Sequence, residues 1–510
     1  MGFYPRSRQE RLSINDPSVR PFRLAVLKAA ALNLLILQIL FLGLFCYLFG
    51  SLFQQSTHIH NINVLFIDYD GGAIGTAVRN AYQKLQSSGF PTLIEHSSTE
   101  YPQPELAVDA VCNIKYWAAL YTTSNASNVL DAALTGGSAA SSYNPSEVLT
   151  MVWNEARYPT VVDSAVSLSL TELSEAARVS FMETGGKQLI QTLNTSDSAA
   201  ISVFSDPWTL ASINVQPTKQ GSRLIYNTLV VILILIQEFF YLGFVNGLYQ
   251  QFHLYTSVSP HRIVIVRQLI SASYTFVGSL CTAGAIWAFR YGWDVNGIQF
   301  VLTWMVLWLF AHLNFLTLDV FTIWLPPQFV PMALISWVVL NVTSILLPFE
   351  LSPGFYKVGY VMPAHSVFQV LVDIWSGGCN PQLNYALPVM FAVEVSSLIL
   401  SSIGVYRRAH YATIKKESDE KSAQERIEAA IAEKLNQMAI RDGNGEADIP
   451  DGESEAPVAL ERRGTMATLE DQEELAGIVR RELSRPPENQ ERRFSLRENT
   501  GPSFYLPFRQ

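Results

Sequence analysis

Residues 29–49 have the sequence AAALNLLILQILFLGLFCYLF and contain no Asp, Glu, Lys or Arg. The hydrocarbon core of a bilayer is about 30 Å thick, and a helix of about 20 mostly apolar residues crosses it. The stretch therefore predicts a membrane-spanning helix, which we place at residues 24–53. It is longer than the apolar region of about 7–15 residues in a secretory signal peptide, so we expect an uncleaved anchor.

Similar apolar stretches recur further along the chain. The 510 residues are 49% hydrophobic and 15% charged, whereas a soluble globular protein is about 25% charged. The fold class expected is a polytopic α-helical membrane protein with six spans. The five later spans form a membrane domain over residues 223–406, with helices at about 225–248, 268–289, 299–319, 329–347 and 386–405.

The positions of Lys and Arg predict the orientation of these spans. Cytosolic flanks carry an excess of these residues. Here they lie before the first span, after the second (Arg262 and Arg267) and after the sixth (Arg407 and Arg408). This pattern places residues 1–23 and the charged tail, 407–510, in the cytosol. Residues 54–222 then face outward, with 7 Lys+Arg against 15 Asp+Glu. We expect a protein of the secretory pathway, in the plasma membrane.

The outward segment is long enough for a core of its own, and its pattern is mixed α/β. Short apolar runs at 63–67, 117–121 and 148–153 predict strands, and helical spacing marks 74–85 and 161–192. Asp68-Tyr69-Asp70-Gly71-Gly72 could hold Ca²⁺, but it lacks the spacing and the later Glu of an EF-hand loop. A plain turn is the favoured interpretation.

Two further segments have no simple assignment as spans. Residues 349–385 are apolar but broken by Pro353 and Pro363, which favours a re-entrant or interfacial hairpin. The tail shows a helical stretch at 423–438 and is expected to be disordered beyond about 442. Thr465 and Ser495 each follow a pair of arginines and resemble phosphorylation sites; an unmodified solvated tail is the alternative.

Two cysteines and two glycosylation sequons lie in segments that are predicted to face outward from the membrane. Cys112 and Cys379 are the two cysteines placed there, and an oxidising compartment would allow a disulfide between them. Asn125 and Asn194 begin glycosylation sequons in the outward domain. The sequon at Asn341 lies inside a span and should be inert.

The sequence lacks the signatures of the common enzymes. It contains no G-x-x-x-x-G-K-[ST], HExxH or G-x-S-x-G motif. We therefore expect no enzyme, and an ATPase would have to act in trans. The eight scattered histidines form no metal-ligand pattern, so no metal or cofactor is expected. An acidic total charge of −9 argues against nucleic-acid binding.

Ionisable residues inside predicted spans are the candidate functional groups. Glu238, His312 and Glu394 all lie toward mid-membrane, where such groups are costly and face a bundle interior or a water-filled path. They could line a substrate or proton route, or they could be packing contacts between helices. Asp319 is expected to be hydrated at the cytosolic interface. Gly243 and Gly247 have a spacing compatible with close helix packing or a homodimer.

Specific motifs resemble a known family. The stretch LSPGFYKVGYVMPAH at 351–365 and the sequence QEFF at 237–240 resemble the fungal nitrosoguanidine-resistance family. The layout of one span, an outer α/β domain and five further spans resembles the membrane subunits of type-2 ABC exporters and the bacterial phage-infection proteins. The stretch VLFIDYDG at 64–71 resembles the first outer strand of those proteins. The resemblance implies a role in resistance to toxic compounds and in membrane lipid behaviour, and it assigns no catalytic residue.

Two functions follow as hypotheses. The first is a protein that aids resistance to toxic small molecules by transporting drug or lipid, or by altering lipid organisation. The second is a non-transporting sensor or scaffold regulated through its cytosolic tail. Membrane lipids, and under the first hypothesis a toxic small molecule, are the expected partners.

Overall fold

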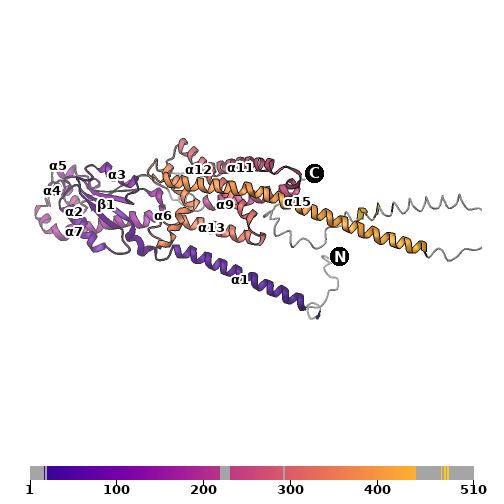
Figure 1. The fold of residues 1–510 in the computed structure, drawn as a ribbon. Coiled ribbons are helices and arrows are strands. Elements are labelled where there is room, and N and C mark those ends of the chain that lie inside the picture. The colour runs from indigo at the N-terminus through magenta and orange to yellow at the C-terminus, as the bar shows by residue number, and fades with distance from the viewer. Residues whose placement is uncertain are drawn as a thin grey trace, which may run out of the picture. The chain divides into compact units, whose positions relative to one another are not determined.

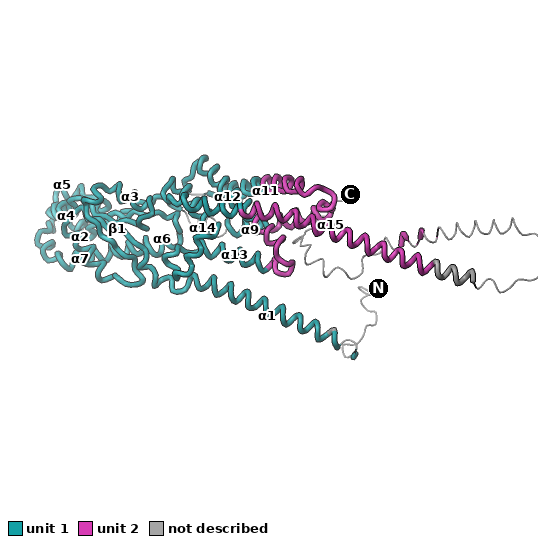
Figure 2. The backbone as a smooth tube through the Cα atoms, in the orientation of Figure 1, with its two compact units in different colours: residues 1–238, 274–314, 332–395 teal, residues 239–273, 315–331, 396–510 magenta. Residues whose placement is uncertain are grey.

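The computed structural model describes residues 16–17, 20–218, 230–290, 293–443, 473, 476–477 and 479–481. Figure 1 shows the chain from its N-terminal helix to the long helix that ends at Gly443. The described residues divide into two compact units, coloured in Figure 2. Unit 1 comprises residues 1–238, 274–314 and 332–395, and unit 2 comprises 239–273, 315–331 and 396–510. Each unit is described by itself.

A five-stranded sheet forms the centre of the α/β domain in unit 1. Its order is β2-β1-β3-β4-β5. β1 is parallel to β2 and β3, β3 is antiparallel to β4, and β4 is parallel to β5. The register aligns Val64 with Ala118, and Ala118 with Trp153. The strands are β1 (Asn63–Asp68), β2 (Thr92–His96), β3 (Ala118–Thr122), β4 (Leu149–Trp153) and β5 (Leu210–Asn214).

Alternate side chains of β1 belong to two different cores. Val64 and Phe66 pack in the larger cluster, whereas Leu65 and Ile67 pack in a smaller one on the opposite face. This follows from the two-residue period of a strand, and it explains why β1 is a continuous apolar run. The sheet is therefore covered on both faces.

Helices cover those two faces. On one face α2 (Ala73–Leu85), α4 (Ala126–Leu134) and α7 (Leu168–Thr192) contact one another, and Figure 1 shows them grouped in the α/β domain. On the other face α3 (Pro104–Cys112) packs against β3 and β4. Shorter elements complete the domain: α5 (Ser138–Ser141), α6 (Pro159–Val162), a π-helical turn (Asp163–Ser167) and α8 (Ser198–Ser205).

The turn after β1 uses its carboxylates internally. Asp68 accepts hydrogen bonds from Thr122 Oγ1 at 2.7 Å and from Arg79 Nη2 at 2.7 Å. Asp70 accepts from the backbone N–H and the hydroxyl of Ser127. Both carboxylates are thus engaged in fixing the entry to α2, as a structural turn requires.

Six described helices are long and apolar enough to cross a membrane, judged by length and composition. Their bounds differ from the predicted spans by at most eight residues, except at the end of the last one. They are α1 (Arg20–Ser51), α9 (Val230–Gln251), α11 (Pro260–Ala288), α12 (Gly297–Trp324), α13 (Val330–Leu346) and α15 (Leu383–Gly443).

The last helix corrects one expectation. The sequence predicted a span at 386–405 and a separate helical stretch at 423–438, but α15 runs unbroken for 61 residues. No Gly or Pro occurs between Val405 and Asp442, and the Ala, Glu and Lys residues there favour helix. The charged residues after Val405 end the apolar stretch, but the helix α15 continues through them.

Residues 349–385 form a compact junction, predicted as a re-entrant hairpin. They contain a 3₁₀ helix, η8 (Gly354–Val361), and α14 (Pro363–Trp375), whose residues are almost all buried. The ring of Phe368 lies 4.9 Å from that of Tyr158, centre to centre. The side chain of Gln299 on α12 donates to the carbonyl of Ile374 at 2.8 Å. The junction therefore packs against both the α/β domain and a membrane helix; its depth in the membrane stays a prediction.

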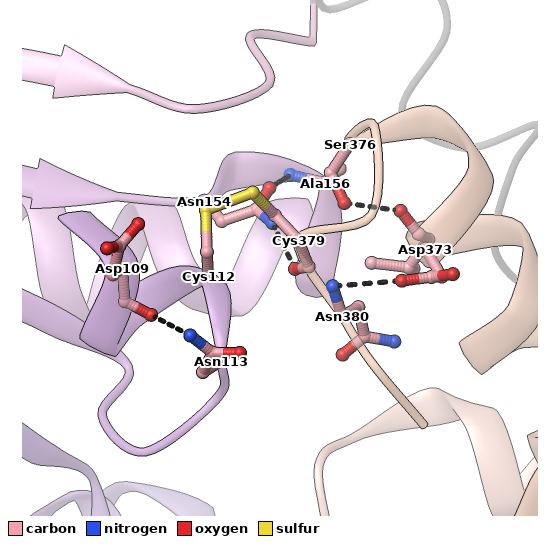
Figure 3. Close-up of a disulfide and its surroundings, with 10 residues drawn as sticks. Asp109, Cys112, Asn113, Asn154, Ala156, Asp373, Ser376, Cys379 and Asn380 are labelled. Carbon is pink, nitrogen blue, oxygen red and sulfur yellow. Dashed lines mark hydrogen bonds between the residues drawn. A yellow bond between two sulfur atoms is a disulfide. The ribbon is translucent and has the colours of Figure 1, made fainter. Parts of the chain in front are cut away.

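A disulfide closes this junction. Cys112 at the end of α3 is bonded to Cys379, 267 residues further along the chain, as Figure 3 shows. Asn154 donates to the carbonyl of Cys379 at 3.2 Å, and the backbone N–H of Asn380 donates to Asp373 at 3.2 Å. The bond thus ties the loop after α14 to the α/β domain.

We predict that Cys112→Ser lowers the free energy of unfolding by about 2–5 kcal/mol, the usual cost of losing a disulfide. Cys379→Ser should cost the same, and the double variant no more than either, because all three remove one bond. Cys281→Ser, at a free cysteine, is the control. Thermal unfolding in detergent, with and without reductant, measures the effect. Wild-type protein that is insensitive to reductant would contradict the prediction.

Candidate functional site

His312 and Glu394 form a hydrogen-bonded pair in unit 1. Nδ1 of His312 on α12 lies 2.6 Å from Oε1 of Glu394 on α15. The two side chains are 13% and 15% exposed. At 1.5 Å per residue, His312 lies about 22 Å from the start of α12 and Glu394 about 16 Å from the start of α15. The structure thus joins two of the three ionisable residues proposed for a route.

The hydrogen-bonding capacity of the His312–Glu394 pair is not fully used. Oε2 of Glu394 is buried and has no hydrogen-bond partner among the described residues. The contact joins an imidazole to a carboxyl group inside an apolar helix bundle. One carboxyl oxygen of the pair is left to accept a further hydrogen bond.

Glu238 is separate from this pair. It lies on α9, is fully buried, and neither of its carboxyl oxygens has a partner within the described ranges. A lone charged carboxylate in an apolar environment is costly. Beside it, a Cβ added to Gly278 of α11 would lie 2.3 Å from Gln237 Nε2. Glycine at 278 thus leaves room for the amide of Gln237 at this position.

Asn314, which lies close to His312 in the sequence, does not join the pair. Its Oδ1 accepts from Nε1 of Trp337 at 2.9 Å, and its Nδ2 donates to the carbonyl of Phe310 at 2.7 Å. These bonds join α12 to α13. Asn314 is therefore a packing contact between helices.

Unit 2 contains a second buried ionic cluster, which the sequence did not predict. Asp319 was expected to be hydrated at the cytosolic interface, but it is fully buried. Its Oδ1 accepts from Arg267 at 2.7 Å and from Arg408 at 3.2 Å, and its Oδ2 accepts from Ser401 at 2.6 Å. Two buried guanidinium groups replace water around this carboxylate, which is why it can be buried in the protein.

The same cluster corrects the roles assigned to its arginines. Arg267 and Arg408 were interpreted as flanking charges outside the spans. α11 begins seven residues before Arg267, however, and α15 continues past Arg408. Arg267 also donates to Asn246 of α9 at 2.9 Å and lies 5.3 Å from the ring centre of Tyr249. A signal was present in the spacing: Ser401 and Arg408 are seven residues apart and share a helix face.

We predict that Asp319→Asn lowers the free energy of unfolding by about 3–5 kcal/mol, because it leaves two buried guanidinium groups without a counter-charge. Arg408→Gln should cost less, since Arg267 and Asp319 remain as a neutral pair. Asp294→Asn, at an exposed aspartate, is the matched control. Thermal unfolding in detergent gives the order. A larger loss for Arg408→Gln than for Asp319→Asn would refute the assignment.

His365 on α14 is held in its neutral form. Its Nδ1 lies 3.1 Å from the carbonyl of Ser344, and its Nε2 lies 3.1 Å from the hydroxyl of Tyr385. Burial lowers the pKa of His365 to about 4 from its usual 6.5, and the bond to Ser344 opposes this only in part. The burial of His365 inside the junction thus favours its uncharged form.

This depressed pKa predicts a pH-dependent stability. The folded-state pKa lies below the unfolded value, so the contribution of His365 is complete above pH 6.5 and declines as the pH falls toward 4. The full shift corresponds to a free energy on the order of 3 kcal/mol. We expect the stability difference between wild type and His365→Gln to shrink over this window. His261→Gln, at an exposed histidine, is the control. A difference that is constant with pH would contradict the prediction.

The other predicted sites fall in different places. The sequon residues Asn125 and Asn194 are exposed on the α/β domain. Asn341 is buried and accepts from the backbone N–H of Ala364 at 3.1 Å. Thr465 and Ser495 lie outside the described residues. In the described ranges no group of three or more His, Cys, Asp or Glu residues could hold a metal ion.

Comparisons with known proteins place the chain in a family. An uncharacterized endoplasmic reticulum membrane protein of Saccharomyces cerevisiae, YJR015W, is 22% identical over 430 residues, which cover 77% of this chain and 83% of that relative. No solved structure matches the chain. Residues 33–399 match the family described as "Protein of unknown function (DUF3533)". Since this match covers more than half of the sequence, the chain is a helical membrane protein that belongs to the DUF3533 family.

Proposed function

We propose that this protein aids resistance to toxic small molecules by moving a drug or lipid across the membrane, or by altering lipid organisation. The observation that carries the proposal is the His312–Glu394 pair, with its 2.6 Å contact and its unpartnered Glu394 oxygen. Ionisable groups inside a membrane domain are expensive and typically serve a substrate or proton path. A proton bound by this pair would couple to substrate movement.

The proposal includes an architecture and an orientation. We propose six spans arranged as in type-2 ABC exporters, both termini in the cytosol and the α/β domain outside, with residence in the plasma membrane. The Cys112–Cys379 disulfide supports an oxidising compartment for the α/β domain. The motif resemblance to the nitrosoguanidine-resistance family supports the role in resistance. No enzymatic step is proposed, and an ATPase would act in trans.

A non-transporting sensor or scaffold is the second candidate. The observation that favours it is the unbroken course of α15, which runs from an apolar membrane segment into the charged tail as one helix. A continuous helix can transmit a displacement along its axis to partners of the tail. This function predicts no flux of any substrate.

Reconstitution separates the two candidates. Purified protein in liposomes is assayed with a fluorescent phospholipid and a cationic dye, with and without an imposed proton gradient. We expect flux that depends on the gradient and falls at least about tenfold in Glu394→Gln, because the pair then lacks a titratable carboxyl. Glu417→Gln changes an exposed glutamate on the same helix and should leave the flux unchanged.

Two results would count against the proposal. If neither probe crosses under any condition, transport fails and the second candidate gains. If both probes cross and Glu394→Gln equals wild type, the pair is a packing contact and carries no route.

A further inference from the structure

The α/β domain has a groove on its helical face, which we call the α2–α4–α7 groove. It has a volume of about 690 Å³ and is lined by residues of α2, α4 and the second half of α7, with Thr135 just after α4. Small-molecule sites usually measure about 300–1,000 Å³. Its floor is apolar, because the lining residues Phe181 and Leu189 are buried in the core. The groove thus has the size and the floor of a small-molecule site.

The threonine hydroxyl groups that line the groove donate hydrogen bonds to nearby backbone carbonyls. A threonine hydroxyl can donate once and accept twice. The hydroxyl of each of the four lining threonines donates to a backbone carbonyl close by in the sequence. The bonds are Thr76 to Gly72 at 3.0 Å, Thr135 to Ala132 at 2.7 Å, Thr184 to Ser180 at 2.7 Å and Thr192 to Leu189 at 3.1 Å. In this arrangement the lone pairs of the four hydroxyl oxygens are available to accept hydrogen bonds from a ligand.

One carboxylate completes this acceptor lining. Asp131 of α4 is the charged side chain that lines the groove, and it makes no hydrogen bond or ion pair with any described residue. Partial burial, and then the neighbouring carboxylate of Asp70, raise the pKa of Asp131 above its usual value. The amide of Gln188 adds a side-chain donor and an acceptor to the lining. A ligand with N–H donors and a positive charge would satisfy Asp131 and the threonine oxygens.

Two further features favour a cation with an apolar body. Residues 54–222 carry 7 Lys+Arg and 15 Asp+Glu, a net charge of −8, so the domain attracts cations from a distance. At Gly185 an added Cβ would meet only Leu189 of the same helix, at 3.8 Å. The missing side chain thus leaves space above the apolar floor.

We infer that the α2–α4–α7 groove binds a small organic cation that carries N–H donors on an apolar body, as amidines and protonated amines do. Asp131 forms the ion pair, the threonine hydroxyls accept the remaining N–H groups, and the apolar body lies over Phe181 and Leu189. The groove would be a capture site outside the membrane helices. It does not depend on transport, because binding is measured directly.

Calorimetric titration of the full chain in lipid nanodiscs tests the inference, with empty nanodiscs as the blank. The probe is benzamidinium, which combines a phenyl ring with a planar cation. Neutral benzamide and anionic benzoate have the same ring without the charge or with the opposite one. We expect benzamidinium to bind at least about tenfold more tightly than benzamide, and benzoate not to bind.

Variants locate the binding in the groove. Asp131→Asn should weaken benzamidinium binding about tenfold by removing the charge-assisted hydrogen bond. Asp109→Asn makes the same change at an exposed aspartate of α3 and should have no effect. Gly185→Leu should abolish binding by filling the groove, with thermal unfolding as the check that the domain is intact.

Three results would overturn the inference. These are equal affinity for benzamidinium and benzamide, equal affinity of wild type and Asp131→Asn, and unchanged binding in a folded Gly185→Leu variant. Absence of benzamidinium binding by the wild type would overturn it as well.

Discussion

A charge buried among apolar helices must be paired or removed, and the positions of the ionisable groups in this protein follow from that cost. Asp319 is buried because two arginines and a serine surround it. His312 and Glu394 are buried together, each supplying the other's partner. Glu238 has no partner among the described residues, so a charge on it would carry the full cost of desolvation.

The two ionic clusters differ in what they can do. Both oxygens of Asp319 accept hydrogen bonds, and its guanidinium partners do not release protons in proteins. This cluster is suited to holding α9, α11, α12 and α15 together in unit 2. Glu394 has one oxygen without a partner among the residues that the structure describes, and its other oxygen faces an imidazole. A group that must exchange a proton needs such an incomplete shell, which is why we assign the proposed route to this pair.

The parts of the fold that could be predicted are those whose cause is local in the sequence. A long uncharged run suffices to predict a helix such as α12, and β1 was predicted because both of its faces are buried and apolar. β2 and β5 lie at the edges of the sheet, where the exposed Glu95 and the half-buried Asn214 break the apolar pattern. Edge strands of this kind have no continuous signal, so sequence reasoning missed them.

The ionic cluster was missed for a different reason. Arg267 and Arg408 lie 52 and 89 positions from Asp319 in the sequence. Each charge bordered an apolar run, where a flanking role in water was the natural interpretation. Only the packing of the helices shows that these charges meet. For Cys112 and Cys379, by contrast, the predicted compartment allowed a disulfide, because the other two cysteines lie in apolar spans, but only the fold brings the two residues together.

The α2–α4–α7 groove shows how local geometry can reverse the chemistry that composition indicates. Four threonines and one glutamine would, by count, offer a mixed set of donors and acceptors. Threonine in a helix often donates to a carbonyl of the preceding turn, however, and all four lining threonines donate to such nearby carbonyls. Their lone pairs are what remains for a ligand. With Asp131 unpaired among the described residues, the groove is complementary to donors and positive charge, and an anionic or acceptor-rich ligand would leave the carboxylate desolvated without compensation.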